Sequence, residues 1–168
     1  MGKDKRMSQK IEVKADLGRL NTVVRSIGDL AQTAVKVGIL AAKNARKDKT
    51  GQSNASIGIV HEFGSYVNHI PERSFLRMPL QHNAKAMTQE IDRLAIGNLI
   101  AGDPMGLMKK VGVVAEGAIG EAFKTKGFGT WRPISKRTQS RKGSDAILIE
   151  TSQLQRSITS AVVKRGST

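Results

Sequence analysis

The segment 58-GIVHEFGSYVNHIPERSFLR-77 has an apolar start, a polar centre and an apolar end. It contains two histidines and two glutamates, namely His61, Glu62, His69 and Glu72. Gly64 favours a turn, and Pro71 excludes the preceding Ile70 from the helical region. The segment is therefore either a metal or catalytic site or a structural junction between two elements, and the residues around it decide between these interpretations.

The clearest helical pattern follows this segment. Apolar residues recur every three or four positions there, which predicts a helix with one apolar face; they are Leu80, Ala84, Met87, Ile91, Leu94 and Ala95. Asp103 and Pro104 then form a helix-start signal, because aspartate caps first-turn amides and proline fits the first helical position. A second helix is expected from there to about Thr125.

This second helix contains four glycines, and each costs roughly 1 kcal/mol relative to alanine. They are Gly106, Gly112, Gly117 and Gly120. We expect them to allow close approach of a neighbour, either within the chain or across a subunit contact.

The N-terminal part predicts a further helix and a strand. Residues 17–33 have apolar positions at helical spacing, and Asp16 is placed to cap this helix. The apolar positions are Leu17, Leu20, Val24, Ile27 and Ala31. Residues 35–41 are rich in β-branched side chains and predict a strand. Residues 10–15 alternate briefly, which allows another short strand.

Two other segments complete the set of elements. Residues 57–63 fit either a strand or one or two helical turns. Residues 156–164 alternate in the manner of a strand, and Thr151 or Ser152 is placed to cap a short helix just before it.

These elements predict an α+β fold, in which a small, mainly antiparallel sheet packs with one N-terminal helix and a long central helix pair. Residues 1–9 are expected to form a basic N-terminal arm, and residues 10–168 a single domain. Residues 43–56 and 124–147 are expected to be polar loops.

Charge is the dominant compositional feature, with 28 Lys and Arg against 14 Asp and Glu. The stretch 124–142 contains no acidic residue, and its basic residues are Lys124, Lys126, Arg132, Lys136, Arg137, Arg141 and Lys142. Such a cluster attracts polyanions or acidic protein surfaces, although solvated loops that only aid solubility have the same composition. Phe128 and Trp131 are expected to anchor the loop.

Several classes of protein do not fit the composition. The absence of cysteine excludes disulfides and thiolate metal sites, and it suggests synthesis in a reducing cytoplasm. The first residues lack the apolar region of a secretory signal, and no apolar run approaches the 18 residues of a membrane span. We therefore expect no membrane contact.

The histidines of the opening segment do not match a known catalytic spacing. A zinc-protease helix needs His-Glu-x-x-His, but Phe63, Gly64 and Ser65 follow His61 and Glu62. A zinc site could be drawn from His61, His69 and His82, but nothing in the sequence sets its geometry. No phosphate-binding loop or nucleophile motif is present either, so the sequence predicts neither an enzyme nor a bound cofactor or metal.

Two groups of short motifs carry a resemblance to a known family. The first is 60-VHEFGS-65 followed by 70-IPERSFLRMPL-80, and the second is 131-WRPISKRT-138, 141-RKG-143 and 148-LIETSQLQRSI-158. In this order and spacing they resemble the phage Mu-like family of virion morphogenesis or tail-completion proteins. The family pattern commonly has proline, leucine and glycine where this chain has Ser74, Ile134 and Ser152, and the change at Ser152 puts the local turn geometry in question.

The resemblance implies a structural virion protein of the phage neck or tail end, assembled in the cytoplasm of a bacterial host. Its function would be to complete or terminate the tail and join it to the head, as a ring that is most often sixfold. Its partners would be copies of itself, tail-tube and head-connector proteins and, through the basic residues, the genome end.

The resemblance also implies that the opening segment is a structural junction. The residues expected to hold that junction are Phe63, Gly64, Ile70, Pro71, Arg73 and Phe75. Arg73 would either pair with a carboxylate or lie exposed on the surface. The alternative function is a nucleic-acid-binding protein without sequence specificity, because the basic stretch with Phe128 and Trp131 also suits phosphate contact and base stacking.

Overall fold

The structure is a computed structural model, and it describes residues 17–46, 51–148 and 152–166. The expected arm 1–9, the short strand 10–15 and the cap Asp16 lie outside the described residues. The predicted α+β fold is confirmed, with seven α-helices and a two-stranded antiparallel sheet in the described part of the chain.

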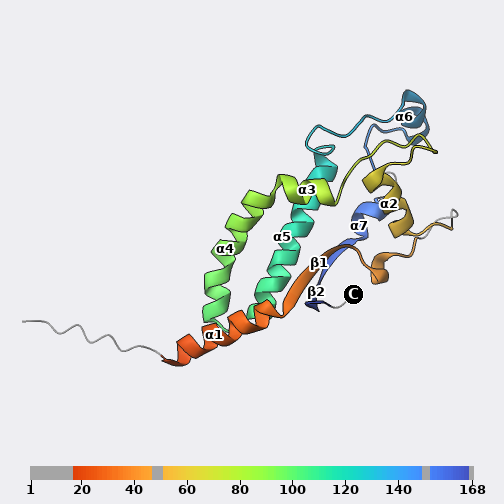
Figure 1. Ribbon diagram of the computed structural model, residues 1–168. Helices are drawn as coiled ribbons and strands as arrows, with labels where there is room; N and C mark the ends of the chain where they lie inside the picture. Colours follow the sequence, from red (N-terminus) through yellow and green to blue (C-terminus); the bar gives the residue numbers. More distant parts are fainter. Residues whose placement is uncertain (1–16, 47–50, 149–151, 167–168) are drawn as a thin grey trace, which may run out of the picture.

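Two long helices form the centre of the molecule and run side by side (Figure 1). They are α4 (Ala84–Ile100) and α5 (Pro104–Lys124). The predicted start signal is confirmed, because the Asp103 carboxylate accepts a hydrogen bond of 2.8 Å from the amide of Gly106. The helix predicted to begin near Leu80 is divided into α3 (Arg77–His82) and α4, with Asn83 between them in a non-helical conformation.

The sheet pairs strands from opposite ends of the described chain. Strand β1 (Thr33–Ile39) begins two residues earlier than predicted, and β2 (Ile158–Lys164) lies antiparallel to it. The register places Thr33 opposite Lys164 and Ile39 opposite Ile158. Since the described sheet has only these two strands, each strand has one backbone edge without a strand partner.

Helix α5 packs against both strands of this sheet. Gly112 makes this contact possible, because a Cβ atom there would lie 2.3 Å from Ser160 Oγ and 2.8 Å from Ser160 Cβ. The expected close approach is therefore found at Gly112. At Gly117 and Gly120 an added Cβ atom would have no neighbour within 4 Å, so these glycines make no such contact within the described chain.

Helix α1 (Leu17–Ala31) confirms the predicted helix, but its apolar face is not in the core. Four apolar side chains of the predicted stripe are more than half exposed: Leu17, Leu20, Val24 and Ile27. The helix instead turns its buried Ser26 inward and crosses the ends of α4 and α5 (Figure 1). Gly102, in the turn between α4 and α5, packs against Thr22 of this helix.

The remaining helices are shorter. Residues 57–63 are helical, as part of α2 (Asn54–Phe63), which Ser53 caps through its side chain. The loop expected over 124–147 was predicted incorrectly in its second half, because α6 (Lys136–Lys142) forms there with Ser135 as its cap. The short α7 (Gln153–Arg156) precedes β2, and the short 3-10 helix η1 (Ala41–Lys43) follows β1.

The core lies where α2, α3 and α7 meet the C-terminal half of α5. Its central contact is aromatic, with the Phe75 and Phe123 rings 5.5 Å apart and the Phe123 and Trp131 rings 5.7 Å apart in an edge-to-face arrangement. The buried cluster consists of Phe75, Ile119, Ala122, Phe123, Trp131, Ile147 and Leu154. Within the described ranges, no helix is long and apolar enough to cross a membrane.

Replacing glycine at two positions of α5 should have opposite effects. Gly112→Ala is expected to lower the free energy of unfolding by roughly 1–3 kcal/mol, because the new methyl group displaces the helix from β2. Gly117→Ala, in open space, should raise it by roughly 0.5–1 kcal/mol because alanine favours the helix. Urea unfolding followed by circular dichroism measures both, and equal effects at the two sites would contradict the close packing of α5 on the sheet.

Candidate functional site

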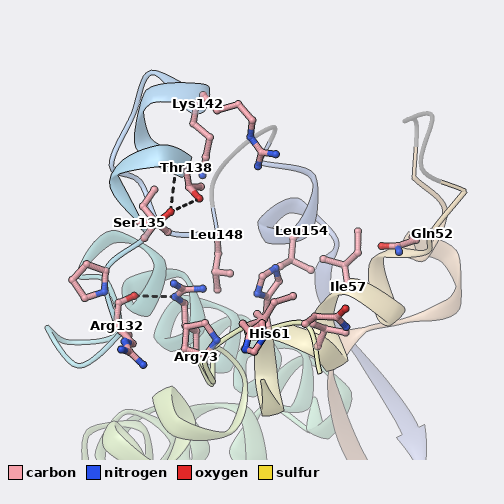
Figure 2. Close-up of a pocket in the computed structure, with 18 of the residues that line it drawn as sticks. Gln52, Ile57, His61, Arg73, Arg132, Ser135, Thr138, Lys142, Leu148 and Leu154 are labelled. Carbon is pink, nitrogen blue, oxygen red and sulfur yellow. Dashed lines mark hydrogen bonds between the residues drawn. The ribbon is translucent and has the colours of Figure 1, made fainter. Parts of the chain in front are cut away.

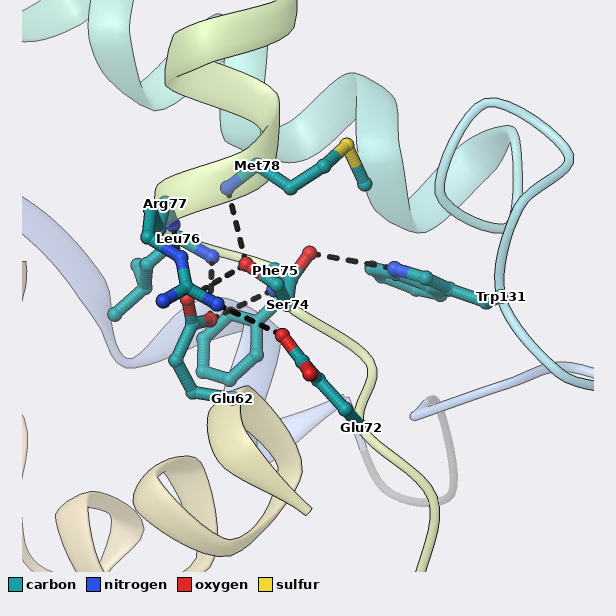
Figure 3. A network of polar contacts seen from close by, with 8 residues as sticks. All are labelled: Glu62, Glu72, Ser74, Phe75, Leu76, Arg77, Met78 and Trp131. Atoms are coloured by element: carbon teal, nitrogen blue, oxygen red, sulfur yellow. Dashed lines mark hydrogen bonds and ion pairs between the residues drawn. The ribbon is translucent and has the colours of Figure 1, made fainter.

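The segment 58–77 is organised around the buried carboxylate of Glu62, which lies in the last turn of α2. This carboxylate accepts hydrogen bonds from Ser74 Oγ at 2.7 Å and from the backbone amides of Phe75, Leu76 and Arg77 at 2.8, 2.9 and 3.1 Å (Figure 3). The Arg77 amide is the first of α3, and the amides of Phe75 and Leu76 lie immediately before it, where backbone donors have no partner inside the helix. Glu62 therefore caps α3 from a different helix.

Ser74 continues this network in the other direction. Its hydroxyl oxygen accepts a hydrogen bond of 3.0 Å from the amide of Met78, so it satisfies a further donor of the first turn of α3. Its backbone carbonyl accepts a bond of 3.3 Å from Trp131 Nε1. The two groups of motifs that carry the family resemblance are thus in direct contact, although they are far apart in the sequence.

Arg73 makes a second link between the two motif groups. Its side chain is 6% exposed, and its Nε donates a hydrogen bond of 3.1 Å to the backbone carbonyl of Arg132. Its own amide donates to the carbonyl of His61 at 2.8 Å. Neither sequence expectation for Arg73 was right, because it is buried rather than exposed and forms no ion pair with a carboxylate of the described residues.

The other junction residues form the turn between α2 and α3. Gly64 has φ +75°, and a Cβ atom there would lie 2.8 Å from the amide nitrogen of Glu72. Ile70 pairs with Ser65 in an isolated β-bridge, which closes the turn. Phe63 remains 62% exposed and lies under the guanidinium of Arg77, 5.5 Å from its carbon to the ring centre.

The expected loop anchors have different contacts. Trp131 is buried in the core, and Gly127, at φ +70°, leaves room for its indole ring. Phe128 stacks on His82, with the ring centres 4.1 Å apart. The described residues contain no group of three side chains arranged as metal ligands, so the zinc site drawn from His61, His69 and His82 is not formed there.

A pocket of about 1080 Å³ opens beside the junction (Figure 2). Its walls come from α2, the turn before Arg73, the stretch after Trp131, α6 and the start of α7. Its basic side chains are Arg46, Arg73, Arg132, Arg141 and Lys142. The described lining contains no aspartate or glutamate.

The predicted electrostatic surface is therefore not a single unit. Of its members, Arg132, Arg141 and Lys142 line the pocket, whereas Lys124, Lys136 and Arg137 do not. Lys126 forms an ion pair with Asp145. Sequence reasoning missed Arg46 and Arg73 as members of the same cluster, because they come from distant segments and no local spacing connects them.

His61 lies in the wall of this pocket with an unusual environment. Its buried Nδ1 has no hydrogen-bond partner among the described residues. Burial, and then the positive charges of Arg73 and Lys142, lower the pKa of His61 to about 4. The imidazole is therefore neutral at physiological pH. At that pH, His61 binds a proton only if an anion offsets the surrounding positive charge.

Comparison with known proteins identifies no relative, since no family model, curated protein or solved structure matches the chain.

Two glutamates in this region provide a matched test of the cap. Glu62→Gln should lower the free energy of unfolding by roughly 2–4 kcal/mol. The NH2 group of glutamine is a donor, so it would face the hydroxyl and amide donors that now bond to a carboxylate oxygen. Glu72→Gln should change it by less than roughly 1 kcal/mol, since its ion pair with Arg77 is about half exposed. Chemical denaturation measures both changes, and a mild effect at Glu62 would show that the cap is not a main stabilising contact.

The neutral His61 predicts a pH dependence of stability. Between pH 6.5 and about 4 the unfolded chain binds a proton at His61 that the folded chain does not, so stability should fall as pH decreases through this range. In His61→Asn this contribution is absent. The melting temperature of the parent should therefore fall more steeply between pH 6.5 and pH 4 than that of the variant. The control is His69→Asn at an exposed position. Parallel pH profiles of the parent and His61→Asn would contradict the buried, neutral imidazole.

Proposed function

We propose that this chain is a structural protein of the phage neck or tail end, which completes or terminates the tail and joins it to the head as a ring. In this proposal the chain has no catalytic activity, and its function is assembly. Its partners are copies of itself, in the sixfold arrangement that the family resemblance implies, together with tail-tube and connector proteins.

The observation that carries the proposal is the exposed apolar stripe of α1, formed by Leu17, Leu20, Val24 and Ile27. These side chains are 66%, 58%, 60% and 52% exposed. A monomeric soluble protein rarely leaves such a contiguous apolar face in water, and larger patches usually mark contacts with other proteins. An amphipathic helix with its apolar face outward suits a subunit whose core is completed by a neighbour.

Two further features support a role in assembly. Ile96 and Ile100 add exposed apolar side chains on α4, the helix that α1 contacts. The outer edges of β1 and β2 offer backbone donors and acceptors to which a neighbouring strand can add. The neck location and the ring come from the family resemblance, whose two motif groups form one packed junction in this chain.

The alternative of a nucleic-acid-binding protein draws support from the basic cluster around the pocket. It predicts that the purified chain binds DNA with an affinity that falls by roughly 0.9 log units per released phosphate contact for each tenfold rise in salt. The assembly proposal predicts weak DNA binding by the isolated chain.

Electron microscopy of phage lysates tests the proposal directly. Deletion of the gene for this chain should give full heads beside unjoined tails, of normal length if the chain joins them and overlong or ragged if it terminates the tube. Infectious particles of normal appearance would overturn the neck assignment.

Two matched variants test whether the α1 stripe is the contact. Leu20→Ser with Val24→Ser should reproduce the deletion defect, whereas Asn21→Ser with Gly28→Ser, at exposed positions of the same helix, should give normal particles. Both variants should remain folded by circular dichroism, because none of the four residues is buried. Normal assembly with the first variant would show that the stripe is not the subunit contact.

A further inference from the structure

The pocket beside the junction combines positive charge with an aliphatic surface. In Figure 2 Arg73 and Arg132 lie on one side of the hollow, whereas Ile57 and Leu154 lie on the other. Leu148 lies between these two sides. A ligand that fills this space would therefore have to offer an anionic group and an apolar group close to each other.

The described lining residues of the pocket include no aspartate or glutamate. Arg73 and Lys142 have neutral partners, since Arg73 donates to the carbonyl of Arg132 and Lys142 Nζ donates to the carbonyl of Ala146 at 2.8 Å. Arg132 and Arg141 form no ion pair with a carboxylate in the described ranges. Arg73 is affected by this charge, because burial, and then the positive charge of Arg132, lowers the pKa of its guanidinium.

Arg73 is the best-defined anion-binding group in this pocket. Its side chain is more than nine-tenths buried, and the bond from Nε to Arg132 fixes its orientation. The two terminal amino groups make no hydrogen bond to the described residues, so they remain available to a ligand. A guanidinium fixed in this way is suited to a carboxylate or phosphate, because its two parallel donors match two oxygens.

The lining also distinguishes between kinds of anion. No Phe, Tyr or Trp side chain is among the described lining residues, so this lining lacks the large aromatic rings on which single-stranded nucleic acids usually stack. The apolar part of the wall is aliphatic, with Ile57, Val60, Ile134, Leu148 and Leu154. Aliphatic side chains beside arginines match a peptide that places a carboxylate next to a Leu, Ile or Val side chain.

We propose that this pocket binds an acidic, aliphatic peptide segment of a partner protein, with a carboxylate on the guanidinium of Arg73 and an aliphatic side chain against Leu148 and Leu154. Arg132, Arg141 and Lys142 supply the surrounding positive charge. This inference does not depend on the neck assignment, because it concerns the binding chemistry of the isolated chain.

Fluorescence anisotropy with the purified full chain tests the proposal. The probe is a fluorescein-labelled peptide of alternating Glu and Leu, compared with the same peptide carrying Gln in place of Glu and with a labelled oligothymidylate. The Glu peptide should bind, and the Gln peptide should bind at least about tenfold more weakly, because charge-assisted bonds to the guanidinium are lost. The oligothymidylate should bind more weakly than the Glu peptide.

A matched pair of variants on α6 separates the pocket from general charge. Arg141 and Arg137 are both exposed on this helix, but only Arg141 lines the pocket. Arg141→Gln should weaken binding of the Glu peptide by about threefold or more, whereas Arg137→Gln should leave it within about twofold. Arg73→Gln should weaken binding of the Glu peptide by at least about tenfold. If that variant does not fold, the comparison of Arg141→Gln with Arg137→Gln still tests whether the peptide binds in the pocket.

Three outcomes would overturn the proposal. The first is the absence of binding by the Glu peptide, and the second is equal weakening by the two α6 variants, which would show non-specific attraction to a basic chain. The third is tighter binding of the oligothymidylate with the same dependence on Arg141, which would assign the pocket to nucleic acid instead.

Discussion

The buried carboxylate of Glu62 is the contact on which the rest of this end of the molecule depends. One side chain from α2 satisfies the backbone donors at the start of α3 and thereby fixes the angle at which the chain enters the central helix pair. The same turn directs Phe75 into the core and Arg73 toward the pocket. A glutamate in a polar sequence segment therefore has a structural role, since its oxygens bond to Ser74 and to three backbone amides.

The sequence predicted the elements whose signals are local. Asp103 and Pro104 start α5 because capping needs only residues within one turn, and the periodicity of residues 17–31 specifies α1. The pattern of residues 57–63 alone fits a strand as well as a helix, although Ser53 just upstream carries the cap that favours the helix. Helix α6 was missed because it is polar on all sides and so has no apolar periodicity, while Ser135 was its only start signal.

The contacts that build the candidate site were beyond local patterns. Glu62 bonds to donors twelve to fifteen positions further along the chain, and Trp131 bonds to Ser74 across 57 positions. The outward orientation of the α1 stripe was equally unpredictable, because periodicity shows that a helix has an apolar face but not what covers it. The departure from the family pattern at Ser152 was informative, since this residue has φ +54°, a conformation that glycine adopts without strain.

The pairing of β1 with β2 also affects how the chain reaches its native state. These strands lie at opposite ends of the described chain, so their register forms only after most of the polypeptide has left the ribosome. Contacts between such distant segments are slow to form, because closing a long loop reduces chain entropy before the contacts compensate for it. The α4–α5 hairpin, by contrast, consists of neighbouring segments and can fold early. Each newly made chain would thus expose an unpaired β1 during synthesis, which makes the timing of strand pairing a constraint on its production in the cell.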